Sequence, residues 1–231
     1  MSETSSASGR IVLVGASGLI GSAVIAQTVG RSDVRLTALA RREFALPPGV
    51  RMELLVAPSS EWPGLIAGAQ ADALVVALGT TWRAAGRDEA AFRAVDEKLV
   101  LDCASAAKAA GVPRCIAVSS VGADPASRNF YLRVKGEVEA ALAALEFDRL
   151  DILRPGLLRG PRGGAPRPAE RLAMLASPLT DVLLHGGLRR YRSVTSKIVS
   201  LAILGLAAEV PKGRFIHEHD AIVRASRPRG N

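Results

Sequence analysis

A tyrosine and a lysine lie four residues apart in this chain, and two serines precede them. Tyr131 and Lys135 share one face of a predicted helix, and Ser119-Ser120 end the strand-like run before it. A phenol has an ordinary pKa of about 10, and a nearby ammonium stabilises the phenolate. We therefore predict Tyr131 as a catalytic acid/base, Lys135 as the residue that tunes it, and Ser120 as the serine that orients the substrate oxygen. Ser119 is the alternative serine, and a core tyrosine beside a surface lysine is the other interpretation.

A glycine-rich loop is the second feature with a chemical use. It reads Gly15-Ala16-Ser17-Gly18-Leu19-Ile20-Gly21 and joins an apolar strand-like run to a helix-like one. In a dinucleotide-binding loop, glycines permit a tight turn, close approach to the pyrophosphate and close packing of the helix. The helix N-terminus adds free N–H groups for phosphate oxygens. A purely structural turn is the alternative. The loop residues that we predict to bind a dinucleotide are Gly15, Ser17, Gly18, Leu19, Ile20 and Gly21.

The end of the next predicted strand distinguishes between cofactors. An acidic residue there would bind the ribose hydroxyls of NAD, whereas an arginine would accept the extra phosphate of NADP. The chain has Ala40 at this place, followed by Arg41 and Arg42. A guanidinium pairs with phosphate through two hydrogen bonds. The sequence therefore favours NADP(H) over NAD(H), unless the two arginines are only solvated.

These residues need a scaffold, and the hydrophobic pattern predicts alternating strands and helices. Short apolar runs without alternation are typical of strands buried on both faces of a parallel sheet. We predict an α/β fold with a doubly wound, mostly parallel sheet and helices on both of its faces. The predicted strands are 11–14, 34–39, 51–56, 73–78, 114–118, 149–153 and about 213–217, and the predicted helices are 19–29, 89–110, 129–145 and about 194–208.

The same pattern predicts a single domain. Residues 1–9 are serine-rich without Lys or Arg, so we predict a disordered tail and not a signal peptide. Residues 10–155 would form a cofactor-binding core, and residues 156–231 a small lobe on the substrate side. This lobe begins with a Gly/Pro/Arg-rich loop over 156–168. Glycines interrupt the uncharged run 11–30, so no membrane span is expected.

Composition narrows the classes of function. Of the 231 residues, 48% are hydrophobic and 23% charged, which excludes a disordered or fibrous protein. The net charge is +8, and residues 154–231 alone carry +9. Such an excess can attract a nucleic acid, an anionic small ligand or an acidic partner surface, or it can form a solvated face. With 4% aromatic residues, base stacking on a nucleic acid is not expected. Two cysteines and three histidines predict neither a disulfide scaffold nor a metal site, and the cysteines favour a reducing, cytoplasmic location.

Five motifs together resemble the short-chain dehydrogenase/reductases, in particular their atypical NAD(P)-binding Rossmann branch, which includes bacterial nucleoside-diphosphate-sugar epimerases. The motifs are GASGLIG at 15–21, ALGTTWRAAG at 77–86, AVSSVGAD at 117–124, NFYLRVKGEVE at 129–139 and LRPGLLRGPR at 153–162. The resemblance implies that the glycines bind the pyrophosphate and that Arg41 binds the 2′-phosphate. It also implies that Lys135 holds the nicotinamide ribose. The further cofactor-binding residues that we expect are Arg42, Leu78, Gly79, Thr80, Ser119, Tyr131, Pro155 and Gly156.

One departure from the family pattern concerns Asp96, which stands near the place where many enzymatic members have asparagine. The expected function is an NADP(H)-dependent oxidoreductase for a small carbonyl or alcohol substrate, with Tyr131 as acid/base. Two alternatives stay open: an NADPH-responsive regulatory or assembly protein with little turnover, and a sugar-nucleotide epimerase or dehydratase. The expected partner is a small molecule, not a nucleic acid or a membrane. A monomer and a homodimer are both compatible with the sequence.

Overall fold

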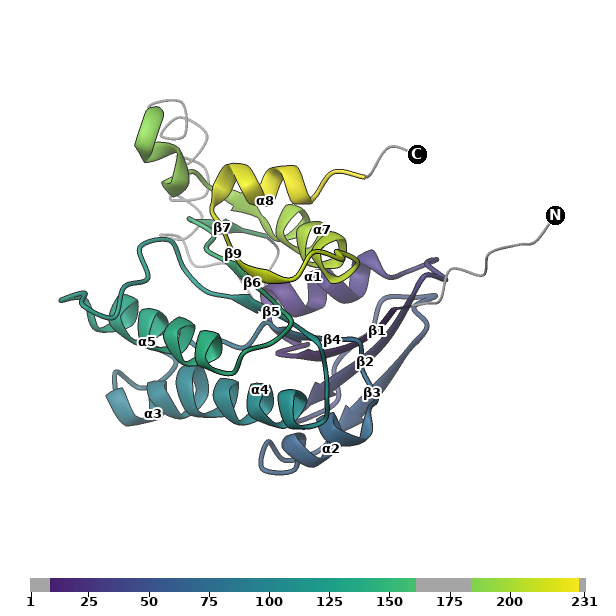
Figure 1. Ribbon diagram of the computed structural model, residues 1–231. Helices are drawn as coiled ribbons and strands as arrows, with labels where there is room; N and C mark the ends of the chain where they lie inside the picture. The colour runs from purple at the N-terminus through teal and green to yellow at the C-terminus, as the bar shows by residue number, and fades with distance from the viewer. Residues whose placement is uncertain (1–8, 161–183, 229–231) are drawn as a thin grey trace.

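Seven parallel strands form the centre of the protein, and helices cover both faces of their sheet (Figure 1). The structure is a computed structural model that describes residues 9–160 and 184–228. The strand order is β3-β2-β1-β4-β5-β6-β9, and all neighbours are parallel. The expected doubly wound α/β fold is confirmed. The strands are β1 (Gly9–Val14), β2 (Val34–Ala40), β3 (Met52–Val56), β4 (Ala73–Val76), β5 (Arg114–Val118), β6 (Arg149–Leu153) and β9 (Gly213–His217).

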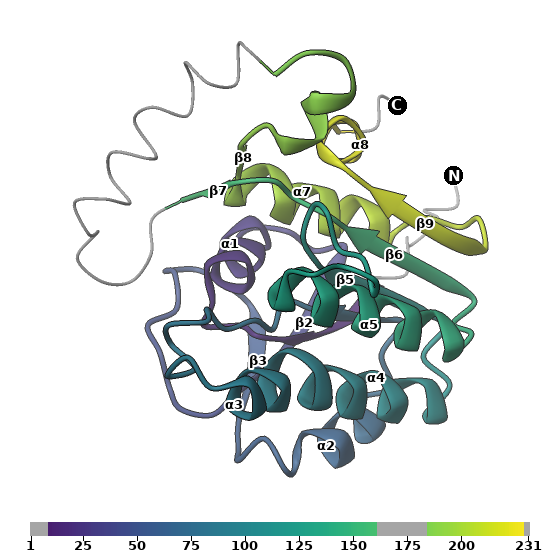
Figure 2. The same ribbon diagram turned by 90° about the vertical axis from the view of Figure 1, so that its left-hand side faces the viewer.

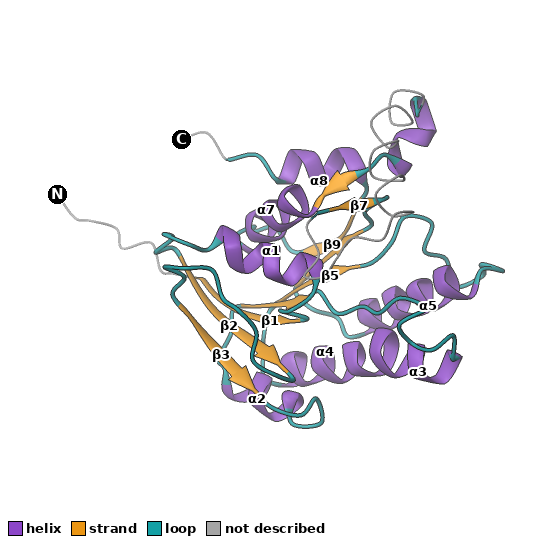
Figure 3. Cartoon of the chain, turned by 180° about the vertical axis from the view of Figure 1, so that it is seen from behind, coloured by secondary structure: helices purple, strands orange, loops and turns teal. Residues whose placement is uncertain are grey.

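Two groups of helices enclose the sheet, as the side view in Figure 2 shows. One group is α1 (Leu19–Gln27), α7 (Ser196–Ala207) and α8 (His219–Ala225). The other is α2 (Trp62–Gly68), α3 (Glu89–Arg93), α4 (Leu99–Ala109) and α5 (Phe130–Ala144), with a π-helical turn, Ala94–Lys98, between α3 and α4. A small lobe, coloured by element type in Figure 3, contains β7 (Leu158–Arg159), β8 (Val194–Thr195) and a 3-10 helix (Gly186–Tyr191).

Each face of the sheet has its own hydrophobic core. In β1, Val12 and Val14 belong to the core on the α2–α5 side, whereas Ile11 and Leu13 belong to the core on the α1–α7 side. All four side chains are at most 4% exposed. Both faces of these strands require apolar residues, so the strands are continuous apolar runs in the sequence.

The sheet topology creates a crevice at the carboxyl end of β1. This strand pairs with β2 on one side and with β4 on the other, so the connections on its two sides run in opposite directions across the sheet. Ligands of open α/β sheets bind outside the carboxyl ends of the strands at such a point. The loops that follow the central strands therefore surround the candidate site.

Most predicted elements are confirmed, and the differences have local causes. The strand predicted over 73–78 ends at Val76, and the backbone of the next two residues, Ala77 and Leu78, lies directly beside Gly15. The helix predicted over 89–110 is correct in extent, but the π-helical turn interrupts it. The hydrophobic pattern does not predict α2 and α8, because these helices are only seven residues long and show little helical periodicity.

Parts of the predicted domain layout lie outside the described residues. These parts are residues 1–8 of the expected tail and residues 161–183, which include much of the loop expected over 156–168. Gly9, expected in the tail, is the first residue of β1. In the part of the chain that the structure describes, no helix is long and apolar enough to cross a membrane.

Candidate functional site

The glycine loop between β1 and α1 has the shape of a phosphate cradle. Gly15 has a φ of +87°, and a Cβ at this residue would overlap the backbone carbonyl of Ala77. A Cβ at Gly21 would overlap the Gly15 carbonyl oxygen, so helix and loop touch backbone to backbone. Gly18 is the N-cap of α1, and its N–H donates to the Gly15 carbonyl oxygen at 3.0 Å. The first turn of α1 has no acidic residue, so its N-terminus can hold an anion without side-chain repulsion.

A cleft of about 730 Å³ opens beside this loop, a volume that suits a cofactor. It brings together three stretches that the sequence analysis singled out. Two residues predicted to bind the cofactor point their side chains elsewhere: Ile20 is buried in the core, and Leu19 lies against Gly160. The predicted residues that line the cleft are Gly15, Ser17, Gly18, Arg41, Arg42, Leu78, Gly79 and Thr80.

Other residues that line the cleft were not predicted from the sequence. Ser59 and Ser60 follow β3 and line the cleft together with Trp62, and Lys98 lines it from the π-helical turn. Trp62 is 3% exposed, and its Nε1 donates to the Ala57 carbonyl oxygen at 3.1 Å. These residues form no recognisable motif. Only the position of Ser59 and Ser60 after the end of a parallel strand would have pointed to this part of the cleft.

A buried ion pair holds Lys135 in place. Its Nζ lies 2.8 Å from Oδ1 of Asp96, and the two side chains are 7% and 1% exposed. The other carboxylate oxygen of Asp96 accepts a hydrogen bond from the backbone N–H of Thr80 at 2.7 Å. The Lys135 Nζ also lies 6.0 Å from the centroid of the Tyr131 ring. Asp96 thus joins the predicted catalytic lysine to the wall of the cleft.

Helix α5 positions the other predicted catalytic groups. Tyr131, Lys135 and Glu139 share one face of α5 because they are spaced four residues apart. The helix begins after Asn129, whose side chain accepts a hydrogen bond from the backbone of its first turn. A Cβ at Gly136 would overlap the backbone of the loop that precedes α5. This glycine therefore lets the helix lie directly against that loop.

The two candidate serines have different surroundings. Ser119 Oγ donates to Oε1 of Glu139 at 2.5 Å, and Arg154 binds the same carboxylate through Nε and Nη2. The Glu139 carboxylate raises the pKa of Arg154 above its ordinary value. Ser120 Oγ makes a long hydrogen bond of 3.4 Å to the Val121 carbonyl oxygen. The Ser119 hydroxyl is thus engaged with a charged pair, whereas the Ser120 hydroxyl is better able to turn toward a substrate.

The loop after β6 lies against the loop that carries the serines. The Val121 N–H donates to the Pro155 carbonyl oxygen at 3.0 Å. A Cβ at Gly156 would lie 2.5 Å from the Arg192 carbonyl oxygen, so this glycine packs closely against the small lobe. Pro155 and Gly156 therefore stand at the same end of the sheet as Ser120.

Aromatic rings support the first turn of α5. Phe92 is fully buried, and its ring centroid lies 5.8 Å from that of Tyr131 and 5.6 Å from that of Phe130. Trp82, in the loop after β4, is 38% exposed and lies 5.2 Å from Phe130. Such edge-on and tilted ring pairs favour a fixed geometry. They help to fix the orientation of Tyr131.

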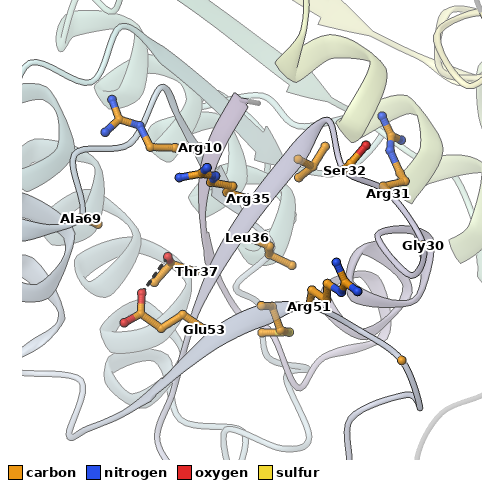
Figure 4. Close-up of a pocket in the computed structure, with 13 residues that line it drawn as sticks. Arg10, Gly30, Arg31, Ser32, Arg35, Leu36, Thr37, Arg51, Glu53 and Ala69 are labelled. Carbon is orange, nitrogen blue, oxygen red and sulfur yellow. Dashed lines mark hydrogen bonds between the residues drawn. The ribbon is translucent and has the colours of Figure 1, made fainter. Parts of the chain in front are cut away.

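A second hollow, of about 710 Å³, lies at the amino ends of β1–β3 (Figure 4). Four arginines line it together with one glutamate. Arg31 forms an ion pair with Asp33, with 2.5 Å between Nη2 and Oδ2. Arg35 and Arg51 lie apart from each other in Figure 4. The amino ends of the strands are opposite to the end where the predicted catalytic residues lie, and none of these residues lines this hollow. We therefore place the candidate site at the carboxyl ends.

The histidines near the C-terminus have carboxylate partners. His217 Nε2 lies 2.8 Å from Oδ1 of Asp151, a fully buried residue that Arg149 also binds. His219 hydrogen-bonds Asp220 at 2.9 Å and lowers the pKa of that carboxyl. Among residues 9–160 and 184–228, no group of three or more His, Cys, Asp and Glu side chains is arranged to hold a metal ion.

Comparison with known proteins finds similarity over most of the chain. A family model described as NAD(P)H-binding matches residues 15–172. The protein fmp52, mitochondrial, of Aspergillus niger is 32% identical over 215 residues, which cover 88% of this chain and 91% of that protein. FMP52, mitochondrial, of Saccharomyces cerevisiae is 33% identical over 198 residues, which cover 84% and 81%. A Thermus thermophilus UDP-glucose 4-epimerase, solved in complex with NAD, has a similar fold with a TM-score of 0.66 at 16% identity, covering 94% of this chain and 82% of that one.

The names of the fungal relatives contradict the expected cytoplasmic location, because they describe mitochondrial proteins. The cytoplasmic prediction depended on two free cysteines, which are both buried. Free cysteines argue against an oxidising compartment. They do not distinguish one reducing compartment from another, so this prediction was wrong for a physical reason.

Proposed function

Because this chain belongs to the NAD(P)H-binding family of atypical short-chain dehydrogenase/reductases, we propose that it is an NADP(H)-dependent oxidoreductase for a small carbonyl or alcohol substrate. The cleft residues fit a dinucleotide, since the glycine loop offers backbone contacts and an acid-free helix N-terminus. One observation supports the proposal that Tyr131 and Lys135 act on a substrate beside the cofactor. Asp96 connects Lys135 to Thr80 in the cleft wall, and Tyr131 lies one turn before Lys135 on the same helix.

Each residue of the site has a role that suits this reaction. When bound, the nicotinamide supplies or accepts the hydride. Tyr131 gives a proton from its phenol oxygen to the substrate oxygen during reduction, and it takes the proton back during oxidation. The ammonium of Lys135 stabilises the phenolate that Tyr131 becomes. Ser120 donates a hydrogen bond to the same substrate oxygen.

The preference for NADP(H) is assigned to Arg41 and Arg42. Both are exposed, follow the end of β2 and line the cleft. Their guanidinium groups can pair with a ribose phosphate, and the preceding residue, Ala40, offers no carboxylate to a ribose hydroxyl. Titration calorimetry of NADPH and NADH with the native chain, Arg41→Ala and Arg42→Ala tests this role. Arg35→Ala is the matched control, because Arg35 is also exposed but lines the hollow at the opposite end of the strands.

We expect the native chain to prefer NADPH and Arg41→Ala to weaken NADPH binding about tenfold or more, as the loss of a charged hydrogen bond would. NADH binding should change little, and Arg35→Ala should behave like the native chain. Equal affinity for both cofactors would contradict the NADP(H) preference. Failure to bind either cofactor would overturn the proposed function.

A turnover screen separates catalysis from binding alone. Native protein with NADPH is mixed with panels of small aldehydes and ketones, and NADPH consumption is followed. Consumption that depends on the carbonyl compound supports the oxidoreductase. Tight NADPH binding without consumption would favour a regulatory or assembly protein, because the same fold can bind the cofactor without using Tyr131.

A further inference from the structure

Asp96 makes contact with two parts of the site at once. One oxygen pairs with the Lys135 ammonium at 2.8 Å, and the other accepts the Thr80 backbone N–H at 2.7 Å. Thr80 lines the cleft, whereas Lys135 lies on α5, on the other side of the carboxylate. A shift of Asp96 would therefore move the cleft wall or release the lysine.

The local backbone is unusual at this residue. Asp96 lies in the π-helical turn Ala94–Lys98, and it is the buried residue of that turn. The π-helical turns that interrupt α-helices are rare and occur frequently at functional sites. Here the turn changes the helical register between α3 and α4, and the side chain at its centre reaches both Thr80 and Lys135.

Burial makes the pair strongly interdependent. Asp96 and Lys135 are 1% and 7% exposed at their side chains, so either charge alone would be costly in this place. Glu139 is also buried on α5, but it is bound by Arg154 and Ser119. Asp96 is therefore the carboxylate that neutralises Lys135.

We propose that Asp96 is a positioning residue, which couples the cofactor-binding segment around Thr80 to Lys135 so that both are held in one geometry. This inference rests on the proposed function. Asp96 acts through Lys135 and the backbone of Thr80, and it does not itself touch the substrate. Its effect on cofactor binding should consequently depend on the presence of Lys135.

A double-mutant cycle tests this dependence. NADPH affinity is measured by calorimetry for the native chain, Asp96→Asn, Lys135→Met and the double variant, and thermal unfolding is recorded for all four. Asparagine can still accept the Thr80 N–H through its amide oxygen, so this variant keeps the loop contact and removes the charge. The double variant contains no unpaired buried charge, which protects it from misfolding. Asp148→Asn is the control, because it removes an exposed aspartate–lysine pair of nearly the same length, 2.9 Å to Lys212.

We expect each single variant to weaken NADPH binding about tenfold. The double variant should also lose about tenfold and no more, because the effects of mutations in a directly coupled pair do not add. Asp148→Asn should bind like the native chain. Losses that multiply in the double variant would overturn the inference while leaving the proposed function intact. A native chain that binds neither NADPH nor NADH would overturn both, so the two failures are distinguishable.

Discussion

The phenol of Tyr131 has a buried aromatic ring on one side and the Lys135 ammonium within reach of its own ring. If this phenol transfers the proton, Tyr131→Phe should reduce turnover at least about 100-fold, because the general acid is lost. NADPH affinity should stay within about twofold, since the ring and its packing remain. Steady-state kinetics and calorimetry on the same preparation give both numbers.

The second tyrosine of the chain provides the control for that experiment. Tyr191 is 40% exposed at the end of the 3-10 helix, and Tyr191→Phe should keep native turnover. Native turnover in Tyr131→Phe would remove Tyr131 from the mechanism, even if cofactor binding were as proposed.

The serines separate a role in stability from a role in chemistry. Ser119→Ala removes a donor from the buried Glu139 carboxylate, so we expect it to lower the free energy of unfolding by about 1–3 kcal/mol. Ser120→Ala loses only a long hydrogen bond, and we expect native stability with turnover reduced about tenfold or more. Denaturant unfolding and kinetics measure the two effects. If the Ser119→Ala variant kept native stability but lost more turnover than Ser120→Ala, Ser119 and not Ser120 would be the serine that orients the substrate.

At the scale of elements, the position of α5 depends on one glycine. A Cβ at Gly136 would overlap the backbone of Asp124 and Pro125, which cannot move as a flexible side chain could. Gly136→Ala should therefore lower the free energy of unfolding by about 1–3 kcal/mol and displace the face of α5 that carries Tyr131 and Lys135. Gly64→Ala in α2 is the matched control, because a Cβ there meets no atom within 4 Å.

The control variant should be neutral or stabilising by up to about 1 kcal/mol, as expected when alanine replaces glycine within a helix. Chemical denaturation of both variants by urea gives the comparison. Equal stability of Gly136→Ala and Gly64→Ala would mean that α5 can move away from the loop without cost.

Most of the scaffold could be predicted from the sequence, because buried parallel strands leave continuous apolar runs such as Ala73–Val76. The π-helical turn could not be predicted, since the residues around Asp96 have an ordinary helical pattern and the turn depends on packing against other elements. Short α2 and α8 offer too few residues for a periodic signal.

The sequence was enough to predict many of the residues that form the candidate site, but it did not predict the contacts between them. The spacing of Tyr131 and Lys135 and the glycine loop are visible in the sequence. The partners of the residues on α5 are on other elements: Asp96, the partner of Lys135, precedes α4, and Arg154, the partner of Glu139, follows β6. Contacts between segments that are distant in sequence depend on the fold, so no local pattern could identify them.

At the scale of the whole molecule, the two cysteines depend on the integrity of the core. Cys103 and Cys115 are completely buried, and burial raises the pKa of each thiol to about 12. The reactive form of a cysteine is the thiolate. We expect both thiols to resist Ellman's reagent at pH 8 in the native protein and to react fully in guanidinium chloride. Rapid labelling of either thiol without denaturant would contradict this close packing.

The same thiols predict how stability changes in alkali. Their ordinary pKa is 9.0, so between about pH 9 and pH 12 the unfolded chain loses protons that the folded chain keeps. The contribution of the thiols to stability is complete below pH 9 and falls as the pH rises through this window. Urea unfolding at pH 8 and pH 10 should show the decrease, and it should be smaller in Cys103→Ala and Cys115→Ala variants that retain the fold.

The position of Trp62 gives the protein an optical property. Of the two indoles in the chain, Trp62 lies in the cleft wall and Trp82 is the partly exposed one. In a Trp82→Phe protein, all indole emission would come from the cleft wall. Reduced nicotinamide absorbs in the region where indole emits, so occupancy of the cleft would appear as energy transfer from Trp62. The fold thus contains a built-in fluorophore that would report whether the cleft is filled, without any attached dye.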